Sequence, residues 1–281
     1  MDPSRANLSE QSPDHAILEA AWGAIRQRMD DWPGDRLLVT GLCGAQGSGK
    51  STLAAALARR AGEQGIAAAV LSIDDLYLTR DEREDLARKV HPLLLTRGPP
   101  GTHDIALGLE TIDALERGEP VRLPRFDKGR DDRAPEIEWD SASADTRLLI
   151  LEGWCVGAVP QEEAALVAPV NTLERDEDPH GAWRAACNNA LADGYRKLFA
   201  RIDLLILLAA PDFDIVREWR GQQEESLHQA NAPEAMDDAA IARFIQHYER
   251  LTRHILIEMP SRADLVVRLA PDRTAIGIET R

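Results

Sequence analysis

Residues 44–51 read Gly-Ala-Gln-Gly-Ser-Gly-Lys-Ser and match the pattern G-x4-G-K-[ST]. The apolar run 37–42 precedes this segment, and Thr-Leu-Ala-Ala-Ala-Leu at 52–57 follows it. This context predicts a strand, a glycine loop and the first turn of a helix in direct succession. Such a loop points backbone N–H groups inward, presents a lysine ammonium to a polyphosphate and offers a hydroxyl to Mg2+. The sequence therefore predicts that the chain binds a nucleoside triphosphate.

The predicted nucleotide-binding residues are those of this Walker A segment and the residue after it. They are Gly44, Ala45, Gln46, Gly47, Ser48, Gly49, Lys50, Ser51 and Thr52. Only four of the 33 basic residues are lysines, and one of these four occupies the phosphate position. The alternative, a glycine-rich turn that binds nothing, is disfavoured by the strand and helix patterns on either side.

Length and charge limit the class of protein. With 281 residues, 44% of them hydrophobic, the chain is long enough for a large core, and we expect one kinase-sized domain at 36–281 behind a helical extension at 1–35. The net charge of −15 disfavours nucleic acid and anionic membranes as partners. Three cysteines without C-x2-C spacing argue against a disulfide framework or a zinc site. No signal-peptide pattern or 18-residue apolar run occurs, so we expect a soluble, cytoplasmic protein. The sequence does not indicate its oligomeric state.

The hydrophobic pattern predicts strands that alternate with helices. Apolar runs predict strands near 36–43, 67–72, 147–151, 203–209 and 264–269, and helical spacing predicts helices near 14–29, 52–62, 105–117, 181–201, 212–229 and 237–257. Continuous apolar strands indicate a sheet that is covered on both faces. The predicted fold is α/β: a three-layer P-loop NTPase fold with a five-stranded, mainly parallel sheet. Residues 73–104 are predicted to form charged helix turns and loops, and residues 119–146 an irregular excursion that is not core. Long loops in a compact domain usually cover an active site.

Acidic residues follow two of the predicted strands. Asp74 and Asp75 come after the second strand, at the sheet edge where open α/β sheets bind ligands. One of them could face a phosphate, and the alternatives are a helix N-cap and a solvated surface charge. Glu152 follows the third strand and is predicted, with Ser51, to bind Mg2+ or its water shell. An acidic residue at a strand end also arises by chance.

Both excursions contain charged segments. Residues 121–133 alternate arginine, lysine and aspartate between prolines, which fits either a substrate site or a solvated surface with ion pairs. Residues 97–104 stand before a helix and fit either a binding loop or the turn and cap of that helix. Arg217 and Arg220 lie three apart on a predicted helix and could bind a transferring phosphate, although ion pairs with Asp214 or Glu218 explain them equally well.

These motifs, in this order, resemble the P-loop D-glycerate 3-kinase family. The resemblance extends over about 36–269 and rests on 44–51, 72–79, His-Pro-Leu-Leu at 91–94, 97–104, 123–128, Glu-Gly-Trp at 152–154 and 170–174. More distantly the chain is similar to the phosphoribulokinase, uridine kinase and pantothenate kinase superfamily. Phe126 stands where those relatives have a tyrosine, so a phenolic contact is unavailable there.

The resemblance implies transfer of the γ-phosphoryl group of ATP to a hydroxyl of D-glycerate, giving 3-phosphoglycerate and ADP, with Mg2+ as the metal. It implies that Asp74 accepts the substrate proton, that Lys50, Arg217 and Arg220 are also catalytic, and that a lid lies at about 211–228. A small anionic substrate needs guanidinium or ammonium donors. The predicted substrate-binding residues are Asp75, Tyr77, Arg97, His103, Asp104, Arg125, Asp127, Lys128 and Arg133.

Two other functions remain open on the sequence. The first is a kinase for another small hydroxyl compound, such as a nucleoside or a pantothenate-like acid. The second is a nucleotide-dependent switch or chaperone, but the chain has no N-K-x-D guanine motif and is too acidic for a nucleic-acid translocase. The partner we expect is thus a small molecule.

Overall fold

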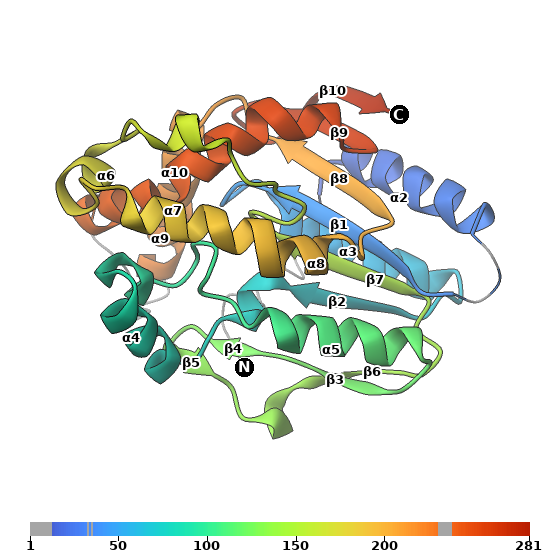
Figure 1. Ribbon diagram of the computed structural model, residues 1–281. Helices are drawn as coiled ribbons and strands as arrows, with labels where there is room; N and C mark the ends of the chain where they lie inside the picture. The colour runs from blue at the N-terminus through green and yellow to red at the C-terminus, as the bar shows by residue number, and fades with distance from the viewer. Residues whose placement is uncertain (1–12, 33, 35, 230–237) are drawn as a thin grey trace.

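A six-stranded sheet with the strand order β10-β9-β8-β1-β7-β2 forms the centre of the molecule. The computed structural model describes residues 13–281 apart from 33, 35 and 230–237 (Figure 1). The strands of this sheet are β1 (Leu38–Gly44), β2 (Ala68–Ser72), β7 (Leu148–Gly153), β8 (Leu204–Ala209), β9 (Leu265–Leu269) and β10 (Ala275–Thr280). The first five are parallel, and β10 pairs with β9 in the antiparallel direction. The predicted α/β class is confirmed, with one strand more than expected.

Helices cover both faces of this sheet (Figure 1). They are α2 (His15–Asp30), α3 (Lys50–Glu63), α4 (Arg80–Lys89), α5 (Ile105–Glu116), α6 (Thr172–Glu177), α7 (Ala182–Ala190), α8 (Arg196–Phe199), α9 (Asp214–Gln229) and α10 (Asp238–Glu258). Every residue of β8 is buried, and successive residues enter opposite cores because side chains alternate along a strand. Leu204 and Ile206 pack with α2, α3 and α9, whereas Leu205 and Leu207 pack with α5, α8 and α10. This is the predicted three-layer arrangement.

Two segments differ from the sequence prediction. Residues 119–146 are not wholly irregular or outside the core, because β3 (Val121–Leu123) pairs with β6 (Asp140–Ala142) and β4 (Phe126–Asp127) pairs with β5 (Asp132–Arg133). Leu123 and Ala142 are buried in one of the two cores. The helix predicted at 181–201 is divided by a π-helical turn, Leu191–Tyr195, between α7 and α8. A local hydrophobic pattern cannot reveal a single extra residue in a helical turn.

An aspartate fixes the start of β8 and of β9 in the same way. Asp203 exchanges two hydrogen bonds with Val39 of β1, through its own N–H and its carboxylate. Asp264 does the same with Leu205 of β8, and its other oxygen accepts from Arg28 of α2 at 2.8 Å. The carboxylate thus supplies an acceptor where the next ladder partner is missing, and it sets the register of each strand.

No helix among the described residues is both long and apolar enough to cross a membrane.

Replacing Asp264 tests this view of the strand start. Asp264→Ala removes the acceptors of the Leu205 N–H and of Arg28, so we expect a loss of about 2–3 kcal/mol in the free energy of unfolding, measured by urea titration. Asp264→Asn is the matched control, since its amide oxygen still accepts the Leu205 N–H and only the ion pair and hydrogen bond with Arg28 are lost. We expect it to lose less than half as much. Equal losses in the two variants would show that the contact with Arg28, not the contact with the strand, matters.

Candidate active site

The phosphate loop lies between β1 and α3, where the chain turns from the sheet into the helix. Gly49 has φ +86° and occupies the position before the first helical residue, Lys50. Gly47 has φ +77°, and a Cβ there would lie 2.5 Å from the Cβ of Trp219 on α9. Both positions therefore require glycine. The loop leads directly into the N-terminus of α3, and the N-terminus of a helix favours an anion.

Two polar side-chain atoms of this loop are buried without a protein partner. Ser48 Oγ and Gln46 Oε1 have no hydrogen bond among the described residues, and Ser48 is buried. Buried polar atoms are nearly always hydrogen-bonded, so these two atoms fit a loop that binds a polar ligand.

Ser51 and Glu152 meet across the loop. The Ser51 hydroxyl donates to Glu152 Oε1 at 3.1 Å. Glu152 is the penultimate residue of β7 and is level with Leu42 of β1 and Ser72 of β2 in the parallel register. Its second oxygen, Oε2, is buried and has no hydrogen bond among the described residues. No group of three metal-ligating side chains occurs in the described part of the chain, so a cation here would complete its shell with water and phosphate oxygens.

Asp74 and Asp75 point to different surroundings. The carboxylate of Asp75 is buried, where it accepts from the Phe126 N–H at 3.1 Å and from Arg125 at 2.8 Å. The carboxylate of Asp74 is about a third exposed (31%) and accepts from Tyr77 and from Lys128, each at 2.8 Å. Asp75 therefore joins the end of β2 to the charged hairpin 125–133, whereas Asp74 remains accessible beside the phosphate loop.

Opposing influences set the protonation of Asp74. Burial has the largest influence and disfavours the charged form, but Lys128 and Lys50, with the hydrogen bonds from Lys128 and Tyr77, outweigh it. They hold the pKa of Asp74 well below its ordinary value. The Asp74 charge in turn raises the pKa of Lys128. Asp74 is consequently an anion across the neutral range, and an electrostatic link joins it to the lysine of the phosphate loop.

The segment 97–104 is held rigidly beside Asp74. Trp154 Nε1 donates to Gly98 O at 3.1 Å, Tyr248 donates to Arg97 O at 3.1 Å, and the Gly101 N–H donates to Tyr195. His103 forms a β-bridge with Tyr77, and the two rings lie 4.7 Å apart. The Asp104 carboxylate caps α5 through the Leu107 N–H, so the helix-cap interpretation of this residue holds.

Each predicted substrate-binding cation of the charged hairpin 125–133 forms an ion pair. Lys128 pairs with Asp74, Arg125 with Asp75 and Asp140, and Arg133 with Asp104. Asp127 accepts the backbone N–H groups of Gly129 and Arg130 and so closes the turn that presents Lys128. The ion pairs that the sequence offered as one interpretation are therefore present, and the substrate role of this segment stays a prediction.

A buried arginine supports this hairpin, and sequence reasoning missed it. Arg83 of α4 is almost fully buried and donates to Leu78 O, Leu95 O and Asp131 O. Asp131 has the left-handed φ of +53° and also pairs with Arg97. Arg83 looks like one of many surface charges of α4 in the sequence, because its partners are brought together only by the fold.

Helix α9 packs against the phosphate loop. Trp219 contacts Gly47, and Arg273, after β9, donates to Gly47 O at 2.6 Å while its guanidinium lies 5.1 Å from the Trp219 ring centre. Arg220 lies over Phe244 of α10, and Arg217 is exposed. Asp214 pairs with Arg253 at 3.8 Å. Side chains at 223–238, which include the end of the predicted lid, lie outside the described residues.

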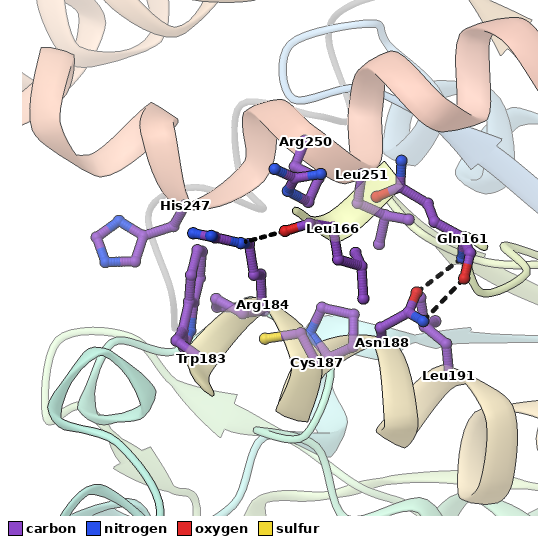
Figure 2. Close-up of a pocket in the computed structure, with 12 residues that line it drawn as sticks. Gln161, Leu166, Trp183, Arg184, Cys187, Asn188, Leu191, His247, Arg250 and Leu251 are labelled. Atoms are coloured by element: carbon purple, nitrogen blue, oxygen red, sulfur yellow. Dashed lines mark hydrogen bonds between the residues drawn. The ribbon is translucent and has the colours of Figure 1, made fainter. Parts of the chain in front are cut away.

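A separate pocket lies behind the Pro99-Pro100 turn, between α7 and α10 (Figure 2). Both arginines that line this pocket already bind protein groups. Arg184 donates to Leu166 O and pairs with Asp178, and Arg250 pairs with Glu174 at 2.7 Å. The 170–174 motif is explained by this contact, because Glu174 is fully buried against Arg250. This pocket therefore belongs to the packing that supports the 97–104 segment.

The comparisons agree on one class of protein. No family model matches the chain. The protein named uncharacterized kinase mug58 of Schizosaccharomyces pombe is 36% identical over 226 residues, which cover 77% of this chain and 80% of that protein. The chloroplastic D-glycerate 3-kinase of Arabidopsis thaliana is 30% identical over 257 residues, 86% of this chain, and the chain spans about half (52%) of that enzyme. The solved D-glycerate 3-kinase of Cryptococcus neoformans var. grubii superposes with a TM-score of 0.79 at 25% identity, covering 95% of this chain and 99% of that one.

Fold, phosphate loop and relatives together define a P-loop kinase, a nucleotide-binding phosphotransferase. The order of the motifs along the chain agrees with a narrower group within that class. The chain belongs to the P-loop D-glycerate 3-kinase family.

The support of the 97–104 segment can be tested at Gly98. Gly98 has φ +119°, and a Cβ there would overlap the Tyr248 hydroxyl. Gly98→Ala should lower the free energy of unfolding by about 1–3 kcal/mol more than Gly101→Ala, as overpacking does. Gly101 is the matched control, because its φ is +101° but the nearest atom is 3.8 Å away. Thermal and urea unfolding measure the difference, and equal losses would argue against a rigid Tyr248 contact.

Proposed function

We propose that this chain transfers the γ-phosphoryl group of ATP to a hydroxyl of D-glycerate, giving 3-phosphoglycerate and ADP. The observation that carries the proposal is the Asp74 carboxylate, bound by Tyr77 and Lys128 and electrostatically linked to Lys50. Two relatives carry the name D-glycerate 3-kinase, which supports this acceptor among the possible hydroxyl compounds. Asp74 and Lys50 bring an acceptor hydroxyl and the phosphate chain to one place.

On the nucleotide side, the amides of 44–51 and the Lys50 ammonium bind the phosphate oxygens, and Thr52 continues the first turn of α3. Ser51 and Glu152 would hold Mg2+, since a hydroxyl and a carboxylate with an unpartnered oxygen are the hard donors this ion prefers. Mg2+ held there would neutralise negative charge on the phosphate oxygens. Arg217 and Arg220 of α9 are proposed to approach the phosphates on closure of a lid at 211–228.

On the acceptor side, the attacking hydroxyl forms a bond to the γ phosphorus, and the bond from phosphorus to the β-γ bridging oxygen breaks. The hydroxyl proton passes to Asp74. Because the pKa of Asp74 is held low, the carboxylate takes this proton late, which suits a loose transition state where positioning and charge matter most. Tyr77 and Lys128 orient the carboxylate for this transfer.

The acceptor carboxylate needs a cation that is not fully engaged. Arg97 is 28% exposed, stacks over Phe126 and pairs with Asp131 through Nη1. Its planar fork offers further N–H groups for a second carboxylate. Arg125 and Arg133 are proposed to support substrate binding by ordering the hairpin. Their partners Asp75 and Asp104, and Asp127 in the turn, are proposed to act in the same way.

A panel of acceptors tests the assignment. Purified protein with Mg-ATP should phosphorylate D-glycerate at the 3-hydroxyl and use L-glycerate, uridine and pantothenate at least 10-fold less efficiently in kcat/KM, about 1.4 kcal/mol of discrimination. NMR of the product identifies the phosphorylated oxygen. Phosphorylation of uridine or pantothenate in preference to glycerate would replace the acceptor but leave the kinase in place.

Asp74→Asn tests the base. Removing a general base costs about 10² to 10⁴ in rate, so kcat should fall by that range while the Kd for ATP stays unchanged. Asp75→Asn is the matched control. It should instead lower the unfolding temperature, because Asp75 binds Phe126 and Arg125 in the interior. Full activity in Asp74→Asn with an inactive, stable Asp75→Asn would transfer the role to Asp75.

A further inference from the structure

His103 presents one ring nitrogen to the protein and leaves the other without a partner. Its side chain is 5% exposed, and Nδ1 lies within hydrogen-bond reach of the Tyr195 hydroxyl. Nε2 is buried and has no hydrogen bond among the described residues. Burial lowers the pKa of His103 to about 4, so the imidazole is neutral at pH 7. A neutral imidazole has one donor and one acceptor nitrogen, so the location of its single proton decides what Nε2 can bind.

Tyr195 determines where that proton lies. The Gly101 N–H donates to the Tyr195 oxygen at 2.9 Å. Burial raises the pKa of Tyr195 most strongly, and hydrogen bonds from the Gly101 and His103 backbones act against that rise, as donors to the phenolic oxygen do. An oxygen that already accepts needs an acceptor for its own hydrogen, and His103 Nδ1 is the atom within reach. This hydrogen-bond pattern favours the tautomer with the imidazole proton on Nε2.

The π-helical turn places Tyr195 under this ring. The turn Leu191–Tyr195 inserts one extra residue between α7 and α8, and each residue of an α-helix rotates the side chain by about 100°. Without the insertion, the side chain at 195 would leave the helix in another direction. The Tyr195 and His103 rings meet edge to face with centres 5.6 Å apart. Single π-helical turns of this kind frequently occur at functional sites.

His103 lies next to Tyr77, on the acceptor side of the candidate site. Tyr77 contacts both His103 and the candidate base Asp74, since its ring packs on His103 and its hydroxyl donates to Asp74. The charge of Asp74 also acts on His103, where it opposes the effect of burial. His103 and the candidate base thus contact the same tyrosine.

We propose that Tyr195 holds His103 as its Nε2–H tautomer, and that this N–H donates a hydrogen bond to an oxygen of the acceptor molecule. His103 is then a substrate-binding donor, and Tyr195 is a positioning residue that acts through it. The shared chemistry of the ligand group is a hydrogen-bond acceptor oxygen, either the 2-hydroxyl or a carboxylate oxygen of the acceptor. The contact with the acceptor molecule rests on the proposed function, whereas the tautomer of His103 can be measured independently of it.

The tautomer can be measured without any substrate. Protein labelled with 15N-histidine should show His103 with a protonated Nε2 and a bare Nδ1, the signal being assigned by its absence from His103→Gln. Tyr195→Phe keeps the ring but removes the hydroxyl, so we expect a mixture of tautomers while thermal unfolding remains cooperative. A protonated Nδ1 in the native protein, or the same tautomer in Tyr195→Phe, would overturn the proposal.

Kinetics then test the donor itself. Glutamine places its amide group near the position of Nε2, whereas asparagine reaches only the position of Nδ1. His103→Asn should therefore lose about 10-fold in kcat/KM for D-glycerate, the worth of one hydrogen bond, with the KM for ATP unchanged. His103→Gln should retain most of the activity, and Tyr195→Phe should fall between them through KM. Equal losses in the Asn and Gln variants, or none in either, would refute a donor at Nε2.

An analogue identifies which oxygen is bound. 3-Hydroxypropionate keeps the carboxylate and the attacked hydroxyl but lacks the 2-hydroxyl. If the penalty of His103→Asn disappears with this analogue, Nε2–H binds the 2-hydroxyl, and if it persists, Nε2–H binds the carboxylate. Should D-glycerate itself not be phosphorylated by the native protein, the acceptor assignment fails, while the tautomer measured by NMR still decides the role of Tyr195.

Discussion

Parallel pairing of β2, β7 and β1 is the constraint on which the site depends. The register sets Ser72, Glu152 and Leu42 at one level across three neighbouring strands, and each chain leaves the sheet within two residues of that level. Asp74, Glu152 and the phosphate loop are therefore brought to one edge by backbone hydrogen bonds alone. A shift of one residue in any of these strands would turn the side chains to the opposite face. The aspartates that start β8 and β9 matter for the same reason, because they fix the neighbouring registers.

The two sides of the site are built on different principles. The nucleotide side is a short local motif whose glycines supply the backbone geometry. The acceptor side is assembled from distant segments by buried aromatic side chains: Trp154, Tyr195 and Tyr248 each hydrogen-bond the backbone of 97–101. A small substrate offers few atoms to bind, so much of the precision has to be in the protein before it arrives. Buried hydrogen bonds from rigid rings provide it at a low cost in conformational entropy.

This difference explains how much the sequence could predict. The strand-loop-helix around Lys50 was predictable because all of its information is contained in a few consecutive residues. Glu152 and Asp74 followed from strand ends, and the structure places both at the predicted edge of the sheet. Arg83 and Tyr195 were not predictable. Their partners are far away along the chain, and a buried arginine or a tyrosine in a π-helical turn has the same local pattern as an ordinary helix residue.

The charges of the molecule show why an acidic chain can bind anions. The net charge is −15, yet in the described residues each of the four predicted substrate cations is paired with a carboxylate. The pairs are Lys128 with Asp74, Arg97 with Asp131, Arg125 with Asp75, and Arg133 with Asp104. The repulsion from distant carboxylates is screened over about 8 Å at physiological salt, so local donors decide binding. Paired guanidinium groups are held in place and still offer N–H groups to a second anion. The ion pairs therefore act less as a source of stability than as a way to orient donors before a substrate enters. Neutral donors such as His103 extend this arrangement, because they bind an oxygen without adding to the charge that must be balanced.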